Sequence, residues 1–285
     1  MGMTNKILIT ADSTCDVPAD LKERYNFKII PLTITLKEEN YLDGVNFSVE
    51  DMYKAFYEDG SLPATAAPNI AQFLDFFKPF INEGYEIIHF DISSALSGTY
   101  SAACLAAEAL KGVYVIDSEM LSSGVLLEMI EAAEAAERGM SATEIVRYIE
   151  DEIRPKTDTS FVLDTLKFMA KGGRCSGVAA MAANILGLRP GLEMKNKELG
   201  VYKKYRGNSK AFYMQYVKER IAGKKIRPGH VFITESGGID QEIISELIEY
   251  VQQEVNPREI HHTYAGCTVA SHCGPGCLGV LFINE

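Results

Sequence analysis

The chain has 285 residues, of which 47% are hydrophobic and 24% are charged; this composition is typical of a globular protein and excludes a disordered or fibrous one. The 28 Lys and Arg residues against 39 Asp and Glu residues give a formal net charge of −11, so we expect binding neither to nucleic acid nor to an anionic membrane surface. No apolar run approaches the roughly 20 residues of a membrane helix. Residues 7–9 are already apolar, which leaves no room for a secretory signal. The six cysteines are scattered without a CxxC pair, and we therefore expect reduced thiols in a cytoplasmic protein.

The first half of the chain alternates short apolar segments with helical patterns. The predicted strands are residues 6–10, 28–36, 86–92 and 113–117. The predicted helices are residues 68–81 with Pro68 in the first turn, 98–110, 125–133, and 141–149 with a capping box formed by Ser141 and Glu144. This alternation favours a mostly parallel sheet that is covered by helices on both faces.

The regular alternation of strands and helices ends after Pro155, where we place a domain boundary. The predicted organisation is an N-terminal α/β domain over residues 1–155 and a C-terminal α+β domain over residues 156–285. The elements predicted for the second half are a strand at 160–163, helices at 164–171 and 176–186, a hairpin at 192–205, a helix at 209–222, a strand at 230–234, a helix at 241–253, and strands at 260–265 and 278–283.

Four loops carry groups that suit a small anionic head group. They are Thr65-Ala66-Ala67-Pro68, Ser97-Gly98-Thr99, Lys171-Gly172-Gly173-Arg174 and His272-Cys273-Gly274-Pro275-Gly276. Hydroxyls and free amides at the start of a helix can hold an anion. For each loop taken alone, an ordinary helix cap or turn is the favoured interpretation.

A metal site is a weaker interpretation of the last loop and its surroundings. Cys267, His272, Cys273 and Cys277 lie close together in the sequence, but thiol-metal sites usually show CxxC spacing, and adjacent His272 and Cys273 do not easily face one ion. Ordinary packing of the small thiols is favoured. The sequence also has no Walker loop, GxGxxG, HExxH, GxSxG or kinase signature.

Taken together and in order, these segments resemble the DegV family of fatty-acid-binding proteins, which includes the carrier subunit of bacterial two-component fatty-acid kinases. The resemblance spans essentially the whole chain, and any one of its motifs is weak alone. Besides the loops above, it rests on Asp12-Ser13-Thr14-Cys15-Asp16, Ile30-Pro31-Leu32, Ser93-Ser94-Ala95-Leu96-Ser97-Gly98-Thr99-Tyr100, Val115-Ile116-Asp117-Ser118, Arg189-Pro190 and Ser271-His272.

The resemblance implies a two-domain DegV-like fold with a long-chain fatty acid, such as palmitate or oleate, in a tunnel between the domains and with no cofactor. It implies that Thr65 and Ser97 bind the carboxylate. Arg174, Arg206 and His272 are implied to surround the head group or to contact a partner kinase. The chain itself has no ATP site, so we expect a carrier without catalytic residues, which presents the acid to a separate kinase for phosphorylation to an acyl phosphate.

Two other functions remain open from the sequence. One is a serine-dependent acyl hydrolase or transferase that uses Ser97, and the other is a lipid sensor that acts through protein contacts alone. The chain also departs from the family at Ala66-Ala67, where Ser-Gln is usual, which could change the head-group network or the helix cap. The sequence does not show whether Phe73, Phe77, Met120, Leu121 and Met181 line the tunnel; core packing is the safer prediction for each.

Overall fold

The N-terminal half is built on a four-stranded parallel sheet. The computed structural model describes residues 6–178, 188–207 and 209–285. Strands β1 (Lys6–Asp12), β2 (Lys28–Ile30), β6 (Tyr85–Asp91) and β7 (Val113–Asp117) pair in the order β2-β1-β6-β7. All of their pairings are parallel, as the alternation of strands and helices predicts. The carboxyl ends of these strands therefore lie along one edge of the sheet.

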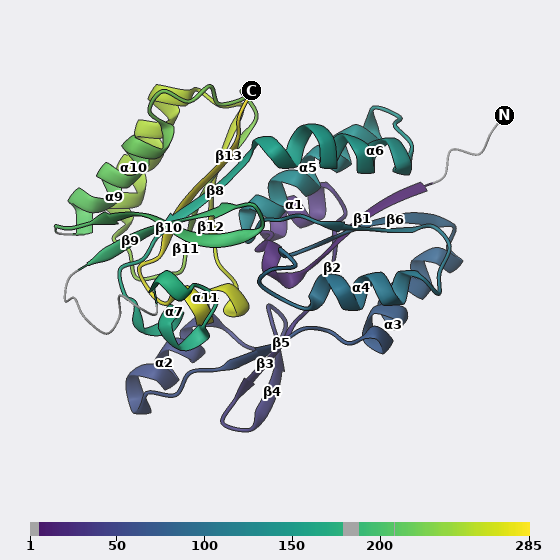
Figure 1. Ribbon diagram of the computed structural model, residues 1–285, viewed down its shortest axis with the longest axis horizontal. Helices are drawn as coiled ribbons and strands as arrows, with labels where there is room; N and C mark the ends of the chain where they lie inside the picture. The colour runs from purple at the N-terminus through teal and green to yellow at the C-terminus, as the bar shows by residue number, and fades with distance from the viewer. Residues whose placement is uncertain (1–5, 179–187, 208) are drawn as a thin grey trace.

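Helices cover both faces of this sheet (Figure 1). Helices α3 (Ile70–Asn82) and α4 (Thr99–Ala107) pack on one face, and α5 (Ser123–Glu137) and α6 (Ala142–Tyr148) pack on the other. Ser141 and Glu144 form the predicted capping box at the start of α6. The start of α3 differs from the prediction, because Asn69 and Gln72 form a capping box that fixes the first helical residue at Ile70 rather than at Pro68. Short helical segments complete this half: η1 (Ser13–Cys15), α1 (Ala19–Arg24), η2 (Ile149–Ile153) and η3 (Arg154–Lys156).

The single strand predicted over residues 28–36 is wrong. The chain breaks at Pro31, which has no N–H to donate to a ladder, and β3 (Thr33–Leu36) leaves the parallel sheet. It pairs antiparallel with β4 (Glu39–Leu42) and β5 (Ala64–Ala66) in a separate three-stranded sheet, which Figure 1 shows at the lower edge of the molecule beside α2 (Val49–Asp59). The sequence did not predict β4, α2 or β5.

The C-terminal half is built on a six-stranded mixed sheet. Its strands are β8 (Thr157–Val162), β9 (Arg189–Lys195), β10 (Glu198–Tyr205), β11 (His230–Glu235), β12 (Glu259–Tyr264) and β13 (Leu278–Ile283), in the order β10-β9-β8-β13-β11-β12. Within this sheet, as far as the structure describes it, only the β11 and β12 pair is parallel. The hairpin predicted at 192–205 is confirmed by β9 and β10.

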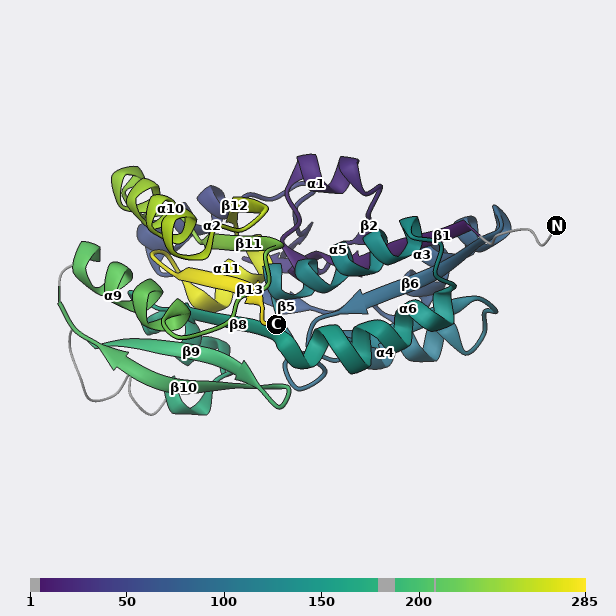
Figure 2. The same ribbon diagram turned by 90° about the horizontal axis from the view of Figure 1, so that it is seen from above.

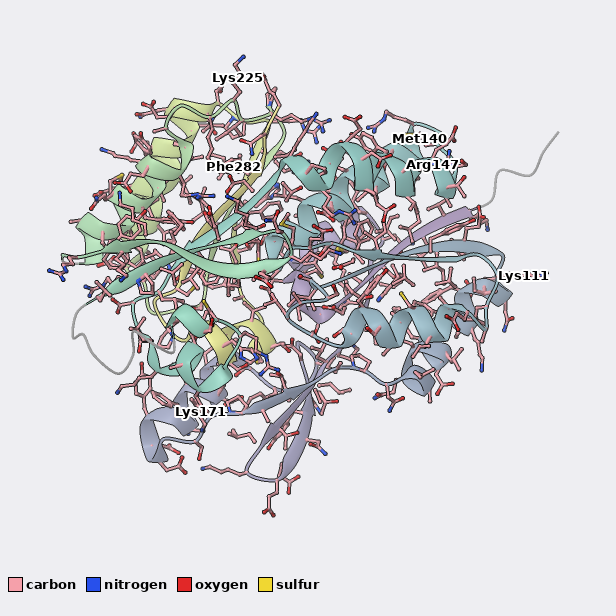
Figure 3. All side chains as sticks on the ribbon, viewed as in Figure 1. Lys111, Met140, Arg147, Lys171, Lys225 and Phe282 are labelled. Carbon is pink, nitrogen blue, oxygen red and sulfur yellow. The ribbon has the colours of Figure 1, made fainter. Side chains whose placement is uncertain are left out.

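The two faces of the six-stranded sheet have different neighbours (Figure 2). Helices α9 (Ser209–Ile221) and α10 (Gln241–Val255) cover one face around a core that includes Phe282, which is labelled in Figure 3. The N-terminal half of α5 packs on the other face. Two further helices whose bounds are fully described are α7 (Lys167–Gly172) and α11 (Cys267–Cys273). The helix predicted at 176–186 lies mostly outside the described residues.

The predicted domain boundary near residue 155 falls in η3, between the last helical segment around the parallel sheet and β8. The boundary itself stays a prediction. Within the described parts of the chain, no helix is both long and apolar enough to cross a bilayer.

Glu128 is a buried acid in the middle of α5. Its side chain is fully buried, and neither carboxyl oxygen has a hydrogen-bond partner among the described residues. Burial raises the pKa of Glu128 well above its usual value, although Arg154 opposes the rise. The folded protein therefore binds a proton at Glu128 more tightly than the unfolded chain does, and it loses stability as the pH rises above about 4.

We expect Glu128→Met to raise the free energy of unfolding by about 1–3 kcal/mol at pH 8, with a smaller gain at pH 4. Urea unfolding at both pH values measures this difference. Glu137→Met, at the exposed end of the same helix, is the control and should change little. A variant less stable than the wild type at pH 8 would contradict the prediction.

Candidate functional site

A cavity of about 490 Å³ lies between the two halves of the molecule. On one side its wall comes from the segments that follow the parallel strands, including Thr14, Ile92 and Leu121. On the other side its wall comes from the six-stranded sheet, including Phe161 and Leu281. Ligands of α/β proteins commonly bind at the carboxyl ends of parallel strands, and the volume is in the usual range for a small-molecule site.

The cavity has an open polar end and a buried end. Ser94, Ser97, Ser101 and Arg174, which are exposed or half-buried, gather at the open end together with Thr65. The residues of the buried end are at most 9% exposed, and the apolar ones include Ile92, Leu121, Phe161, Met169, Cys277 and Leu281. This arrangement suits a ligand with a charged head and an apolar tail.

Helix α11 forms one wall of the cavity and is held in place by two acids from the N-terminal half. Asp16 accepts a hydrogen bond from the Gly266 N–H at 2.8 Å. Asp43 accepts from the N–H groups of Cys267 and Thr268 at 2.9 and 3.3 Å. The first N–H groups of a helix have no partner within the helix, so these carboxyl groups cap α11 across the two halves. The sequence did not predict α11, because its own N-cap residue, Gly266, has no side chain to cap it.

The structure brings Thr65 and His272 into contact. Thr65 lies in the middle of β5 and pairs with Ile34, and His272 lies in the last turn of α11. The Thr65 Oγ1 atom is 3.2 Å from His272 Nε2. These residues are separated by 207 positions in the sequence, and both line the cavity.

His272 is uncharged near neutral pH. Burial, helped by the nearby Arg174 guanidinium, lowers the pKa of His272 to about 4. Its Nδ1 atom lies against Gly172 and has no hydrogen-bond partner among the described residues. Arg174, whose Nη1 donates to the Gly172 carbonyl at 2.6 Å, is therefore the cation beside His272. His272 therefore supplies a hydrogen-bonding group rather than a positive charge.

The close contact between Gly172 and His272 gives a prediction. A Cβ atom at residue 172 would lie 2.3 Å from His272 Nδ1, a distance at which one group must move. We expect Gly172→Ala to displace the imidazole from Thr65 and to weaken ligand binding in the cavity by about tenfold, which a titration with a fluorescent fatty acid, the ligand class that the sequence resemblance implies, measures. A Cβ atom at Gly173 would meet no atom within 4 Å, but the φ there is +69°; Gly173→Asn tolerates that backbone and is the control. Unchanged affinity in Gly172→Ala would contradict the prediction.

Ser97 lies at the start of α4. Its Oγ atom is 2.6 Å from Thr99 Oγ1 and accepts a hydrogen bond from the Thr99 N–H at 3.3 Å. Among the described residues, no histidine or carboxylate is hydrogen-bonded to Ser97. The contacts that a serine nucleophile would need with a base are thus not seen here, and nothing specific favours the hydrolase alternative.

The other residues singled out in the sequence divide between the cavity and its surroundings. Arg206 is exposed and is not among the residues that line the cavity. Leu121 lines the cavity, whereas Phe73 and Phe77 pack in a separate core beneath α3. Met181 lies outside the described residues. The Ala66-Ala67 departure does not change the helix cap, because Asn69 provides it; Ala67 lines the cavity.

The group of residues with the geometry closest to a metal site is not the cysteine and histidine cluster that the sequence suggested. Among the described residues, only His230, Glu259 and His261 place three possible ligand atoms within 4.8 Å of one another, so the candidate formed by Cys267, His272, Cys273 and Cys277 is not such a group. Arg24 already donates two hydrogen bonds to Glu259, and Arg258 lies 2.6 Å from His230 Nε2. Because two cations occupy this group, we assign it no ion.

Comparison with known proteins identifies the family. The family model described as "Uncharacterised protein, DegV family" matches residues 6–285. The chain belongs to the DegV family. A DegV domain-containing protein of Clostridium acetobutylicum is 31% identical over 288 residues, which cover 98% of this chain and 99% of that protein.

Solved DegV structures have the same fold. A DegV family protein from Thermus thermophilus, described by its fatty acid binding, has a TM-score of 0.87 and 27% identity over 98% of this chain and 100% of that chain. A stearic acid-binding protein from Eubacterium ventriosum has a TM-score of 0.82 and 25% identity over 97% of each chain. The predicted family and the α/β DegV-like fold are therefore confirmed.

Proposed function

We propose that this protein binds a long-chain fatty acid in the cavity between its two halves, with the carboxylate at the open end and the tail in the buried end. The observation that carries the proposal is the change in exposure along the cavity: hydroxyls and Arg174 lie at the opening, and buried side chains, among them Ile92, Phe161 and Leu281, lie inside. Two similar solved proteins support it: the DegV family protein from Thermus thermophilus, described by its fatty acid binding, and the stearic acid-binding protein from Eubacterium ventriosum.

The tail supplies most of the affinity in this proposal. About 14 methylene groups at ~0.8 kcal/mol each give a gross gain of about 11 kcal/mol on burial, of which the loss of ligand freedom cancels a part. Thr65, Ser97 and Arg174 then fix the carboxylate at the opening. A net hydrogen bond to a charged group adds about 1.5–3 kcal/mol.

The proposal extends to a carrier role in the cytoplasm. An acid held with its carboxylate at the opening is accessible to a separate kinase, which would transfer the terminal phosphoryl group of ATP to a carboxylate oxygen and leave an acyl phosphate and ADP. Exposed Arg206 and Arg174 are the residues that we propose for contact with this partner. Formation of an acyl phosphate from the loaded protein, ATP and a cognate kinase tests the carrier role and separates it from a lipid sensor.

Mass spectrometry of lipids extracted from the natively purified protein tests the binding itself. We expect about one fatty acid per chain, and less in protein that carries Thr65→Ala and Ser97→Ala. If no fatty acid is recovered and added palmitate, oleate and stearate do not bind, the proposed function is wrong.

A further inference from the structure

Buried polar atoms without partners gather around the cavity. Seven described residues have such side-chain atoms: Asp91, Glu128, Thr159, Arg220, Glu235, Thr268 and His272. Four of them also line the cavity: Thr159, Glu235, Thr268 and His272. A buried polar atom without a partner destabilises a folded protein, so several around one cavity indicate that its occupant supplies the missing hydrogen bonds.

Three of these residues are not explained by a carboxylate beside Thr65 and Ser97. Thr159 is on β8, Glu235 is at the end of β11, and Thr268 is on α11 one helical turn before His272. Their exposures are 1%, 1% and 5%. They come from three separate elements, and a plain hydrocarbon tail offers none of them a hydrogen bond.

Other polar side chains of the cavity wall do have hydrogen-bond partners within the protein. Ser122 donates to Asp16, Ser236 donates to the Gly274 carbonyl, and Thr234 lies 2.8 Å from the Thr263 hydroxyl. Thr159 and Thr268 line the same wall, and Thr159 Oγ1 packs against Gly124 of α5, but neither hydroxyl has a hydrogen-bond partner within the described part of the chain. The lack of a hydrogen-bond partner is therefore specific to a few side chains, such as Thr159 and Thr268, and is not shared by every polar side chain of this wall.

The chemistry of the three groups narrows the choice of ligand. A threonine hydroxyl can donate or accept, whereas a carboxylate oxygen only accepts. Glu235 Oε1 is 2.9 Å from His262 Nε2, and Oε2 is the atom without a partner among the described residues. A ligand that satisfies Glu235 must offer a donor, which a keto or epoxide oxygen does not have and a hydroxyl does.

We propose that the preferred ligand is a hydroxy fatty acid, whose chain hydroxyl bonds to Thr159 or Thr268 and can also donate to Glu235. This inference rests on the proposed function, because it assumes that the carboxylate and tail occupy the cavity as described. It adds that the cavity selects for oxygen on the chain. Hydrogen-bonding sites of this kind discriminate strongly against ligands that lack the matching group.

Calorimetric titration of the whole protein with stearate and with 18-carbon acids hydroxylated at carbon 3, 10 or 12 tests the proposal. At least one hydroxy acid should bind about tenfold more tightly than stearate. Thr159→Val or Thr268→Val should reduce that ratio to threefold or less. Thr157→Val is the matched control, because Thr157 lies two residues before Thr159 on β8 and donates to the Ile153 carbonyl outside the cavity lining.

The outcomes separate the two proposals. If stearate binds as tightly as every hydroxy acid, the proposed preference for hydroxy acids is wrong. Water then satisfies Thr159, Thr268 and Glu235, and the proposed function stands. If a hydroxy acid is preferred but both valine variants keep the full preference, these threonines are not its site and the inference is overturned. If neither stearate nor any hydroxy acid binds, the proposed function fails, and this inference fails with it.

Discussion

Replacing Thr65 and Ser97 together by alanine is expected to weaken fatty-acid binding by at least about 100-fold. Each hydroxyl can donate one hydrogen bond to the carboxylate, and a net hydrogen bond to a charged group contributes about 1.5–3 kcal/mol. Loss of both corresponds to roughly two to four factors of ten in the dissociation constant. Titration with a fluorescent fatty acid, or displacement of it by stearate, measures the loss.

A matched control for this double variant is Ser94→Ala. Ser94 lines the same cavity, but its hydroxyl donates to Asp117 at 2.6 Å. We expect its removal to change fatty-acid affinity by less than about threefold. A double variant that binds with wild-type affinity and holds the carboxylate in the same position, as seen in crystals of the complex, would refute the roles of Thr65 and Ser97.

Asp43→Ala is expected to lower the free energy of unfolding by about 3 kcal/mol and to weaken fatty-acid binding as well. The carboxyl group of Asp43 accepts hydrogen bonds from Ser13 Oγ at 2.8 Å and from two N–H groups at the start of α11. Its removal leaves the hydroxyl of half-buried Ser13 and the N–H groups of buried Cys267 and Thr268 without this partner, at about 1–3 kcal/mol each before relaxation. Because α11 carries His272, a loosened α11 also disturbs the contact with Thr65.

Urea unfolding and fatty-acid titration of the same preparation measure the two effects of Asp43→Ala. Asp240→Ala is the control: Asp240 also caps a helix, α10, but it does so within its own segment and at an exposed position. Its loss should cost about 1 kcal/mol and leave binding unchanged. Equal effects of the two substitutions on stability and on binding would show that Asp43 acts as an ordinary cap.

The elements that the sequence predicts best carry their own local signals. The strand predicted over residues 278–283 has the same bounds as β13, and α10 differs from its prediction by two residues at one end. The hairpin of β9 and β10 follows from its polar turn, where Asn196 and Lys197 both have positive φ. The sequence does not predict where this turn docks: Ser93 Oγ donates to the Lys197 carbonyl, and Lys197 Nζ binds Asp117.

The candidate site is predictable in part because its polar residues lie in loops with recognisable motifs. Thr65, Ser97, Arg174 and His272 stand out in this way, and all four line one cavity. Arg206 stands out in the same way and lies outside that lining. Thr159 and Thr268 do not stand out, because a threonine in a strand or beside a cysteine has no pattern that distinguishes it from ordinary structure.

The composition determined the class of protein, since 285 residues with 47% hydrophobic content and a charge of −11 imply a globular acidic chain. The order of strands and helices determined the fold class of each half, because period and capping are local properties of the chain; the separate β4-β3-β5 sheet was not predicted. The tertiary structure alone decided which side chains face the ligand. Helix α11 illustrates the reason: it has no side-chain cap of its own and is capped by Asp16 and Asp43, more than 200 residues earlier. The tertiary structure also decided the charge of His272, because burial beside Arg174 makes its imidazole neutral. The residues next to His272 in the sequence do not determine that environment.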